Sequence, residues 1–381
     1  MSLLMSNEET MSTKAMASNK RLMSLDALRG FDMLFIMGFS LVIREFCALF
    51  PGGADCALAQ TVKHSVWDGL TLFDTIFPLF LFIAGVSFPF SYAKQVASNM
   101  SRGKIYMKIL RRAVILIFLG LVYNDFFKLD FENLRFCSVL GRIGIAWSLA
   151  ALLFINFSTK TRIVISSVIL VGYWLLICYV PAPDVVGALP LSKEGNLVGY
   201  VDRMITPGTL IYGTFDPEGL LSALPAVVTA MLGMFTGEFV RRDDITEQKK
   251  AGYMGLASIA LLAVGLVWSL VFPVNKALWS SSFVLVVGSY SLAMFALFYY
   301  VIDVRGYQKW ATPFVVIGLN SITIYMAQRI IPFKSISAFF LQGFADMLPQ
   351  EWSALLMRIG YLAVSWLFLY FLYKKKVFLK I

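Results

Sequence analysis

The segment that decides the fold runs from Lys63 to Phe88 and reads KHSVWDGLTLFDTIFPLFLFIAGVSF. It begins beside His64, the only histidine among 381 residues. It then enters an apolar stretch of the length that a helix needs to cross a bilayer. Asp68 and Asp74 stand at the head of this stretch, where carboxylates are costly unless a partner or a cavity accommodates them. Two interpretations follow: the polar residues form a proton-transfer site, or His64 is interfacial and the aspartates cap the helix.

The composition of the whole chain indicates an all-α polytopic membrane protein. Hydrophobic residues make up 59% and charged residues only 15%, whereas charged residues are about a quarter of a soluble domain. The apolar residues come in blocks of about 20, the length of a membrane-spanning helix. The net charge of +10 requires no nucleic acid partner, because inward-facing loops collect lysine and arginine.

The apolar blocks predict about ten transmembrane helices. Their approximate bounds are 27–44, 70–92, 110–127, 138–156, 163–180, 220–240, 252–272, 281–302, 313–331 and 353–373. The connecting segments alternate in charge, and 22 of the 33 lysines and arginines fall on segments assigned to one side. Because cytoplasmic loops carry the excess of positive charge, both termini are predicted in the cytoplasm and His64 near the outer face.

The chain divides into one long membrane domain and two short tails. Residues 1–23 are polar and are predicted to form a disordered cytoplasmic tail. Residues 24–376 form the transmembrane domain, and residues 377–381 a second cytoplasmic tail. The outer loop 181–219 is rich in proline and glycine, and such an irregular segment could lid or line an outer cavity.

The sequence lacks the motifs of several soluble enzyme classes. It contains no P-loop, no dinucleotide-binding glycine pattern after a strand, no HExxH and no cysteine–histidine cluster. Since His64 is the only imidazole, zinc sites and Ser-His-Asp sites elsewhere in the chain are excluded. We therefore predict no metal, and we expect any imidazole chemistry to use His64.

Arg142 is the most informative charge inside a predicted span. A guanidinium cannot be neutralised and must find an anion. Two interpretations remain: a structural ion pair with Asp74 or Asp32, or contact with a ligand. Near the inner ends of the spans, basic residues can bind phosphates, although membrane topology alone also explains them.

Several blocks of the sequence resemble the bacterial relatives of heparan-α-glucosaminide N-acetyltransferase. These blocks keep their order over about 21–330, and they are RLMSLDALRGFDMLFI (21–36), the Lys63–Phe88 segment, VLGRIGIAW (139–147), FDPEGLLSALPAVVTAMLGMFTGE (215–238), NKALWS (275–280), VIDVRG (301–306) and GLNSITIYM (318–326). The resemblance implies a multi-pass homodimeric enzyme of the bacterial inner membrane. Such an enzyme moves acetyl from cytosolic acetyl-CoA to the amine of an amino sugar or glycan end on the periplasmic side. The essential histidine of the family falls on His64.

The resemblance also implies a distribution of roles within the transmembrane acetyltransferase domain, 24–376. The predicted acceptor and acyl pocket comprises Ser40, Trp67, Arg142, Asp216, Glu218, Asn320 and Ser321. Ser40 stands where the animal enzyme has an asparagine, which leaves the choice of acyl group or acceptor open. Asp68 or Asp74 could fix the histidine tautomer, and Asn320 and Ser321 could stabilise the oxyanion.

Charge places the co-substrate on the cytoplasmic side. The phosphates of coenzyme A are prohibitive in hydrocarbon, so we expect its nucleotide among Arg29, Arg111 and Arg112. Only the thin pantetheine arm needs to enter the protein. That arm is shorter than the ~30 Å hydrocarbon core, so His64 should line a pocket sunk from the outer face.

Two mechanisms and two other functions remain open at this point. His64 could accept acetyl as an acyl-imidazole or deprotonate the acceptor amine while both substrates are bound. Within enzymes, the alternative is O-acetylation of an envelope polysaccharide. Outside enzymes, the alternative is a solute transporter whose buried charges form the path.

Overall fold

The computed structural model of the protein describes residues 22–379, which form helices and turns without a strand. The first half contains α2 (Met23–Leu34), η1 (Phe35–Phe39), α3 (Ser40–Ala48), η2 (Gly53–Asp55), α4 (Ala57–Thr61), η3 (Leu72–Thr75), α5 (Ile76–Ala97), α6 (Arg102–Tyr123), η4 (Phe126–Lys128), α7 (Val139–Asn156) and α8 (Thr159–Tyr179). The second half contains α9 (Leu197–Ile205), α10 (Ala223–Val240), α11 (Glu247–Ser269), α12 (Ser281–Phe298), η5 (Tyr299–Val304), η6 (Lys309–Ala311), α13 (Thr312–Gly318), α14 (Ser321–Ile330), α15 (Phe333–Ala345) and α16 (Gln350–Lys374).

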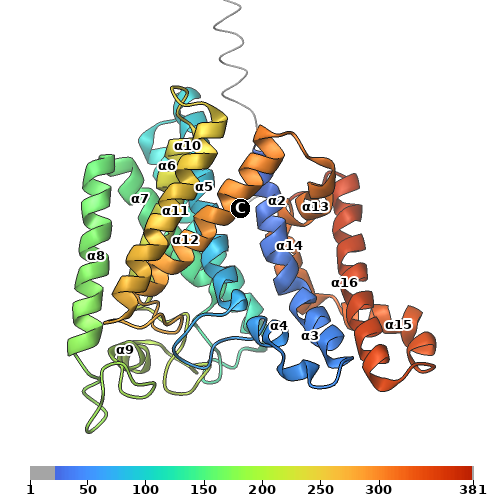
Figure 1. Ribbon diagram of the computed structural model, residues 1–381. Coiled ribbons are helices and arrows are strands. Elements are labelled where there is room, and N and C mark those ends of the chain that lie inside the picture. Colours follow the sequence, from blue (N-terminus) through green and yellow to red (C-terminus); the bar gives the residue numbers. More distant parts are fainter. Residues whose placement is uncertain (1–21, 380–381) are drawn as a thin grey trace, which may run out of the picture.

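Within residues 22–379, seven helices are long and apolar enough to cross a membrane. They span Leu72–Ala97, Val139–Asn156, Thr159–Tyr179, Ala223–Val240, Glu247–Ser269, Ser281–Val304 and Gln350–Lys374. The pair Lys309–Gly318 and Ser321–Ile330 passes the same test as one span bent by 58°. These helices form one bundle (Figure 1), and the predicted all-α polytopic membrane fold is confirmed.

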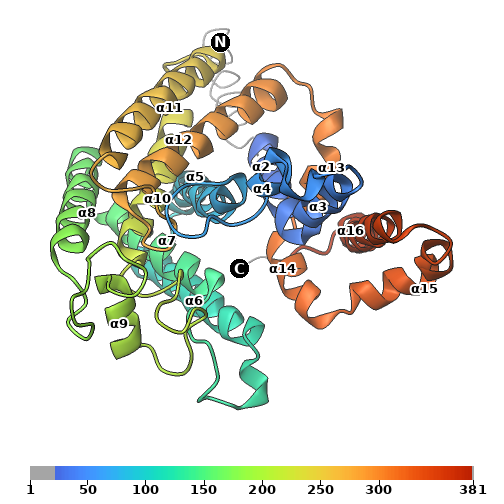
Figure 2. The same cartoon turned by 60° about the horizontal axis from the view of Figure 1, so that its bottom comes forward.

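The two remaining predicted spans, 27–44 and 110–127, are also helical. They fall on α2–α3 and on α6, which carry charges such as Asp32 and Arg111 and are therefore less apolar than the others. Helix α2 packs against α13, and α6 packs along α7 (Figures 1 and 2). The count of ten spans and the side of each terminus stay predictions.

Glycines set the close packing of the two central helices, α5 and α10. A Cβ atom added to Gly85 would lie 2.2 Å from the carbonyl oxygen of Ala230, and one added to Gly233 would lie 2.1 Å from that of Phe82. Only glycine permits this approach, as is common between membrane helices, where small residues let the backbones meet. Helix α5, the apolar half of the Lys63–Phe88 segment, is thereby fixed at the centre of the bundle.

Two helices of the bundle are broken. Gly38 adopts φ 115° in η1, which interrupts the path from α2 to α3. The second break separates α13 from α14 at residues 319–320. Gln328 of α14 links the two broken helices, because its Nε2 donates to the carbonyl of Met37 at 3.3 Å. Broken helices leave free backbone groups that a side chain of this kind can satisfy.

The loops with α4 and α9 lie together at one end of the bundle, and the loop between α10 and α11 lies at the other (Figure 1). We call the first the His64 end, because His64 lies between α4 and η3. The 181–219 loop contains α9 and is braced internally by an ion pair of Arg203 with Asp184 at 2.7 Å. The predicted disordered tail, 1–23, lies outside the described residues except for Leu22 and Met23, and Met23 begins α2.

Candidate active site

His64 and Asp74 form a close pair at the start of α5. Nδ1 of His64 lies 2.7 Å from Oδ1 of Asp74. At this distance a proton must lie between the two atoms. In the neutral ring, Nδ1–H therefore donates to the carboxylate, and Nε2 keeps a free lone pair. The Asp74 side chain is 1% exposed and that of His64 is 48% exposed, so the carboxylate is fixed while the ring remains accessible.

The local sequence explains why Asp74 is held in place. Thr71 and Asp74 form a capping box at the start of η3, in which each side chain accepts the backbone N–H of the other. The Oδ2 atom of Asp74 also accepts from the Ser65 backbone N–H at 3.0 Å and from the Thr71 hydroxyl at 2.9 Å. Asp74 thus caps the helix and orients His64 at once, whereas a proton-transfer role for this pair stays a prediction.

Lys276 is the third member of the site, and sequence reasoning missed it. Its Nζ lies 3.1 Å from Nδ1 of His64 and 3.3 Å from Oδ1 of Asp74. Burial lowers the pKa of Lys276, and the adjacent Asp74 carboxylate opposes part of that effect. The available signal was the NKALWS block that carries the family resemblance, although nothing in its spacing relates it to His64.

Asp68 does not contact His64; it ties two loops together. Asn275 donates from Nδ2 to Oδ1 of Asp68 at 3.0 Å, and the Gly69 backbone N–H donates to the Val274 carbonyl at 2.8 Å. These bonds dock the 270–280 loop on the 63–71 loop and bring Lys276 to the imidazole. Of the two carboxylates predicted as tautomer partners, Asp74 is the one in contact.

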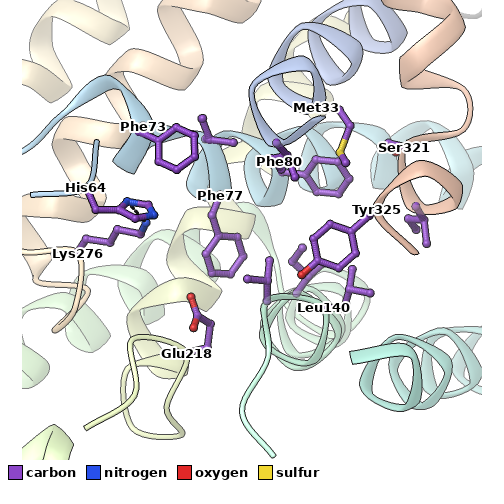
Figure 3. A pocket seen from close by; sticks show the side chains of 15 residues that line it. Met33, His64, Phe73, Phe77, Phe80, Leu140, Glu218, Lys276, Ser321 and Tyr325 are labelled. Atoms are coloured by element: carbon purple, nitrogen blue, oxygen red, sulfur yellow. Dashed lines mark hydrogen bonds between the residues drawn. The ribbon is translucent and has the colours of Figure 1, made fainter. Parts of the chain in front are cut away.

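His64 and Lys276 line one end of a cavity of about 180 Å³. Glu218 faces the same space, and Ser321 and Tyr325 line its far side (Figure 3). The remaining lining is mostly apolar, namely Met33, Ile36, Phe73, Ile76, Phe77, Phe80, Val139, Leu140, Ile143 and Ile322. A small apolar chamber with polar groups at its two ends suits a short acyl group.

Glu218 is held by a buried ion network at the DPEG turn. Arg135 donates to both oxygens of Asp216, at 2.7 and 2.6 Å, and also pairs with Glu218. The two carboxylates hold the pKa of Arg135 above its usual range, against the effect of burial. The network brings two predicted pocket residues, Asp216 and Glu218, to one place, and Glu218 reaches the cavity.

Asp202 of α9 fixes the same turn from the other side. Its carboxylate accepts the backbone N–H groups of Asp216 and Leu220 at 3.2 and 3.0 Å. Burial raises the pKa of Asp202 to about 6. A Cβ added to Gly219 would lie 2.1 Å from this carboxylate, so the turn requires glycine at that position.

We expect Gly219→Ala to lower the free energy of unfolding by about 1–3 kcal/mol, because an overpacked site must rearrange. The new methyl group displaces the Asp202 carboxylate from the two N–H groups that hold the turn. Thermal unfolding of the purified protein in detergent measures the change. Gly172→Ala is the matched control, because a Cβ at Gly172 meets nothing within 4 Å. Equal melting temperatures for the two variants would contradict the packing argument.

Arg142 supports the turn rather than pairing with an aspartate. Its guanidinium donates to the Gly219 carbonyl at 2.9 Å and to the Ser222 hydroxyl, and it lies 5.0 Å from the centre of the Trp279 ring. In the part of the chain that the structure describes, neither Asp74 nor Asp32 forms a salt bridge with it. The interpretation as an ion pair with Asp74 or Asp32 is therefore wrong: the guanidinium bonds a carbonyl and a hydroxyl, and the carboxylates near it are those of Glu218, Asp202 and Asp216.

Three other predicted pocket residues do not line this cavity. Ser40 is buried at the start of α3, beyond the break at Gly38. Trp67 donates from Nε1 to the Leu191 carbonyl at 3.0 Å and so binds the 181–219 loop. Asn320 donates from Nδ2 to the Val377 carbonyl at 3.0 Å, so its amide is engaged with the C-terminal segment. Ser321, the next residue, does line the cavity.

A second cavity, of about 390 Å³, carries basic side chains between α5, α6 and α7. Lys108, Arg111 and Arg112 line it. The Arg112 guanidinium lies 4.2 Å from the centre of the Trp147 ring, and its Nε is buried without a hydrogen-bond partner among the described residues. Arg29 adjoins this cavity, because its Nη2 donates to the hydroxyl of Ser87, a lining residue, at 3.1 Å.

The two cavities follow the same faces of α5 and α7. On α5, Phe80 lines the first cavity and Ser87 lines the second. Along the axis of a helix these two residues are ~10 Å apart. On α7, Ile143 lines the first and Trp147 the second, ~6 Å apart. Because α5 starts at the His64 end, the basic cavity lies toward the opposite end of the bundle.

No group of three or more histidine, cysteine, aspartate or glutamate side chains within residues 22–379 is arranged to hold a metal ion. The first cavity presents imidazole, carboxylate, ammonium and hydroxyl groups.

Comparisons with known proteins agree with the resemblance. Residues 21–128 match a family described as a domain of unknown function, DUF5009. Heparan-alpha-glucosaminide N-acetyltransferase of Homo sapiens is 28% identical over an alignment 427 positions long, gaps included, which covers 95% of this chain and 60% of the relative. The mouse (Mus musculus) protein of the same name is 29% identical over an alignment 384 positions long, gaps included, which covers 84% of this chain and 56% of the relative. The chain thus spans less than two thirds of either relative's length. The bacterial origin stays a prediction, and the resemblance itself is confirmed: over most of its length this chain is related to heparan-alpha-glucosaminide N-acetyltransferase.

Proposed function

We propose that the protein is a transmembrane acetyltransferase that moves acetyl from acetyl-CoA to an amine on the other side of the membrane. The observation that carries the proposal is the pairing of the two cavities along α5 and α7. One holds an imidazole with a free Nε2, and the other holds a cluster of basic side chains. The names of the human and mouse relatives support an amino sugar, or the amino end of a glycan, as the acceptor.

We assign the basic end of the bundle to the cytoplasm and the His64 end to the periplasm. The excess of positive charge on the cytoplasmic loops of membrane proteins supports this orientation. The phosphates of coenzyme A bind at Arg111 and Arg112, which can donate charge-assisted hydrogen bonds. The pantetheine arm then passes between α5 and α7 and presents the thioester in the His64 cavity.

Acetyl transfer needs an amine, a base and a group that stabilises the oxyanion. The acceptor approaches as an ammonium ion, which the Glu218 carboxylate attracts. Once deprotonated, the amine nitrogen attacks the thioester carbonyl and the C–S bond breaks. The ammonium loses two protons in the reaction, and the departing thiolate takes one of them. The second proton is released to solvent. Ser321 and Tyr325 line the far side of the cavity, where a hydroxyl can donate to the developing oxyanion.

Two routes use the same geometry. Nε2 of His64 takes a proton from the amine directly, or it first receives the acetyl group and releases coenzyme A. A single turnover with labelled acetyl-CoA and no acceptor separates the routes. Label that stays on the wild-type protein, and is absent from His64→Ala, supports the acyl-imidazole. No retained label together with turnover in the presence of glucosamine supports the direct route.

The proposal is tested by incubating purified protein with labelled acetyl-CoA and either glucosamine or an envelope polysaccharide. Labelled N-acetylglucosamine is the expected product. O-acetylated polysaccharide without N-acetylglucosamine would assign the protein to the alternative reaction. Solute uptake without any acetyl transfer would identify a transporter.

We expect Arg112→Gln to raise the KM for acetyl-CoA about tenfold with little change in kcat, because one charge-assisted contact to phosphate is lost. Initial rates over a range of acetyl-CoA concentrations provide the measurement. Arg241→Gln is the matched control, since Arg241 is an exposed arginine in the loop after α10, outside the cavity. The same KM for wild type and Arg112→Gln, or the same increase in both variants, would argue against this phosphate site.

A further inference from the structure

Three charged or titratable groups meet at one point of the first cavity. Oδ1 of Asp74 lies 2.7 Å from Nδ1 of His64, and the Lys276 ammonium lies 3.3 Å from the same oxygen. The ammonium is also 3.1 Å from Nδ1. Because Nδ1 carries the proton that it donates to Asp74, it cannot also accept one from Lys276. Nζ of Lys276 and Nδ1 of His64 therefore both donate to the Asp74 carboxylate, and they lie close together because they share this acceptor.

This arrangement opposes the usual effect of an aspartate on its histidine. A carboxylate beside an imidazole favours the charged imidazolium, in which the ring is neither base nor nucleophile. A positive charge at 3.1 Å disfavours the imidazolium. The other groups that face the ring are Glu218 and Tyr325 across the cavity. Glu218 is negative, like Asp74, and is already paired with Arg135. Lys276 is therefore the positive charge nearest to the ring among the described residues.

Lys276 is one of several contacts that hold its loop against the start of α5. The neighbouring bonds from Asn275 to Asp68 and from Gly69 to Val274 already dock that loop. The Lys276 side chain is only 16% exposed, and burying an ammonium is costly. The cost of burying this charge, in a loop that other bonds also dock, points to a role at the imidazole.

We propose that Lys276 is a positioning residue that keeps His64 neutral, by cancelling the attraction of Asp74 for an imidazolium. Asp74 then fixes the tautomer and the ring orientation without fixing a second proton on Nε2. The inference rests on the proposed function only in that a neutral imidazole is the reactive form.

The chain offers a direct test, because its single histidine gives one set of imidazole signals. The protein is labelled with ¹⁵N-histidine, purified with a tag that contains no histidine and titrated by NMR in lipid nanodiscs. We expect Lys276→Met to raise the pH at which the ring gains its second proton by about one unit or more. Lys276→Arg, which keeps the charge, should titrate within a few tenths of a unit of the wild type.

An unchanged or lowered midpoint in Lys276→Met would overturn the inference. Lys276→Gln provides a second neutral variant if the methionine variant does not fold, and the same two outcomes apply to it. The acidic limb of the pH profile of kcat/KM should move in the same direction and by the same amount. Because the titration needs no turnover, a raised midpoint in a protein without acetyl transfer would refute the proposed function and leave the role of Lys276 standing.

Discussion

Replacement of His64 by alanine is expected to lower the rate of acetyl transfer by at least about 10³-fold. In the proposed mechanism the ring supplies Nε2 as base or as acyl acceptor, and such groups contribute about 10² to 10⁴-fold or more. Only one imidazole exists in the chain, so no second histidine can substitute. Rates of N-acetylglucosamine formation at saturating acetyl-CoA provide the measurement.

The loss should be chemical and not structural. The His64 side chain is 48% exposed, so its removal leaves no buried cavity, and the melting temperature should stay near that of the wild type. Val66→Ala, in the same loop and 92% exposed, is the matched control and should retain full activity. A collapsed or aggregated His64→Ala protein would indicate a structural histidine, and an active one would refute the proposed site.

Asp74→Asn is expected to reduce activity by about 10² to 10⁴-fold, the range seen when the carboxylate partner of a catalytic histidine is removed. The amide no longer selects the Nδ1–H tautomer, so the lone pair on Nε2 is lost in part of the population. The amide also leaves Lys276 without its carboxylate partner. The measurement is kcat for wild type and variant over a range of pH.

Asp68→Asn is the matched comparison, because the sequence could not decide which of the two aspartates is the partner of His64. Asp68 accepts from Asn275 and does not contact His64, so its amide variant should lose less than about tenfold. An Asp68→Asn variant impaired as strongly as Asp74→Asn would mean that loop docking, rather than tautomer control, limits the reaction.

The local features of the site could be predicted from the sequence because they arise within one segment. Between Lys63 and Phe88, the apolar run specifies the span and the polar residues before it specify the turn. His64 and Asp74 are ten positions apart, close enough for a capping box and one turn to bring them together. The same reasoning could not choose between Asp68 and Asp74, since both stand at the head of the span.

The distant contacts could not be predicted, because they depend on how the helices pack. Lys276 reaches His64 across a sequence separation of 212 residues, and the Arg142 guanidinium binds a carbonyl 77 residues away. A charge inside a span indicates that some partner exists, but the identity of the partner of Arg142 follows from the packing of α7 against α10. The break at Gly38 was missed for a similar reason, since a glycine within an apolar run also fits an unbroken helix.

The basic residues of the second cavity are visible in the sequence, but the sequence does not show whether they form a site. Arg111 and Arg112 lie where membrane topology alone favours positive charge, so their pattern does not distinguish a phosphate site from a topology signal. The structure adds the cavity and the ring of Trp147 beneath the Arg112 guanidinium. Those two features support the proposal that Arg111 and Arg112 form a phosphate site.

The central claim is that acetyl crosses the membrane through this bundle while coenzyme A stays on one side. The most direct measurement uses proteoliposomes with glucosamine enclosed and labelled acetyl-CoA, which cannot cross the bilayer, supplied outside. We predict labelled N-acetylglucosamine in the lumen with the wild type and none with His64→Ala. Product that forms only when both substrates are on the same side, or no product in either arrangement, would contradict the account.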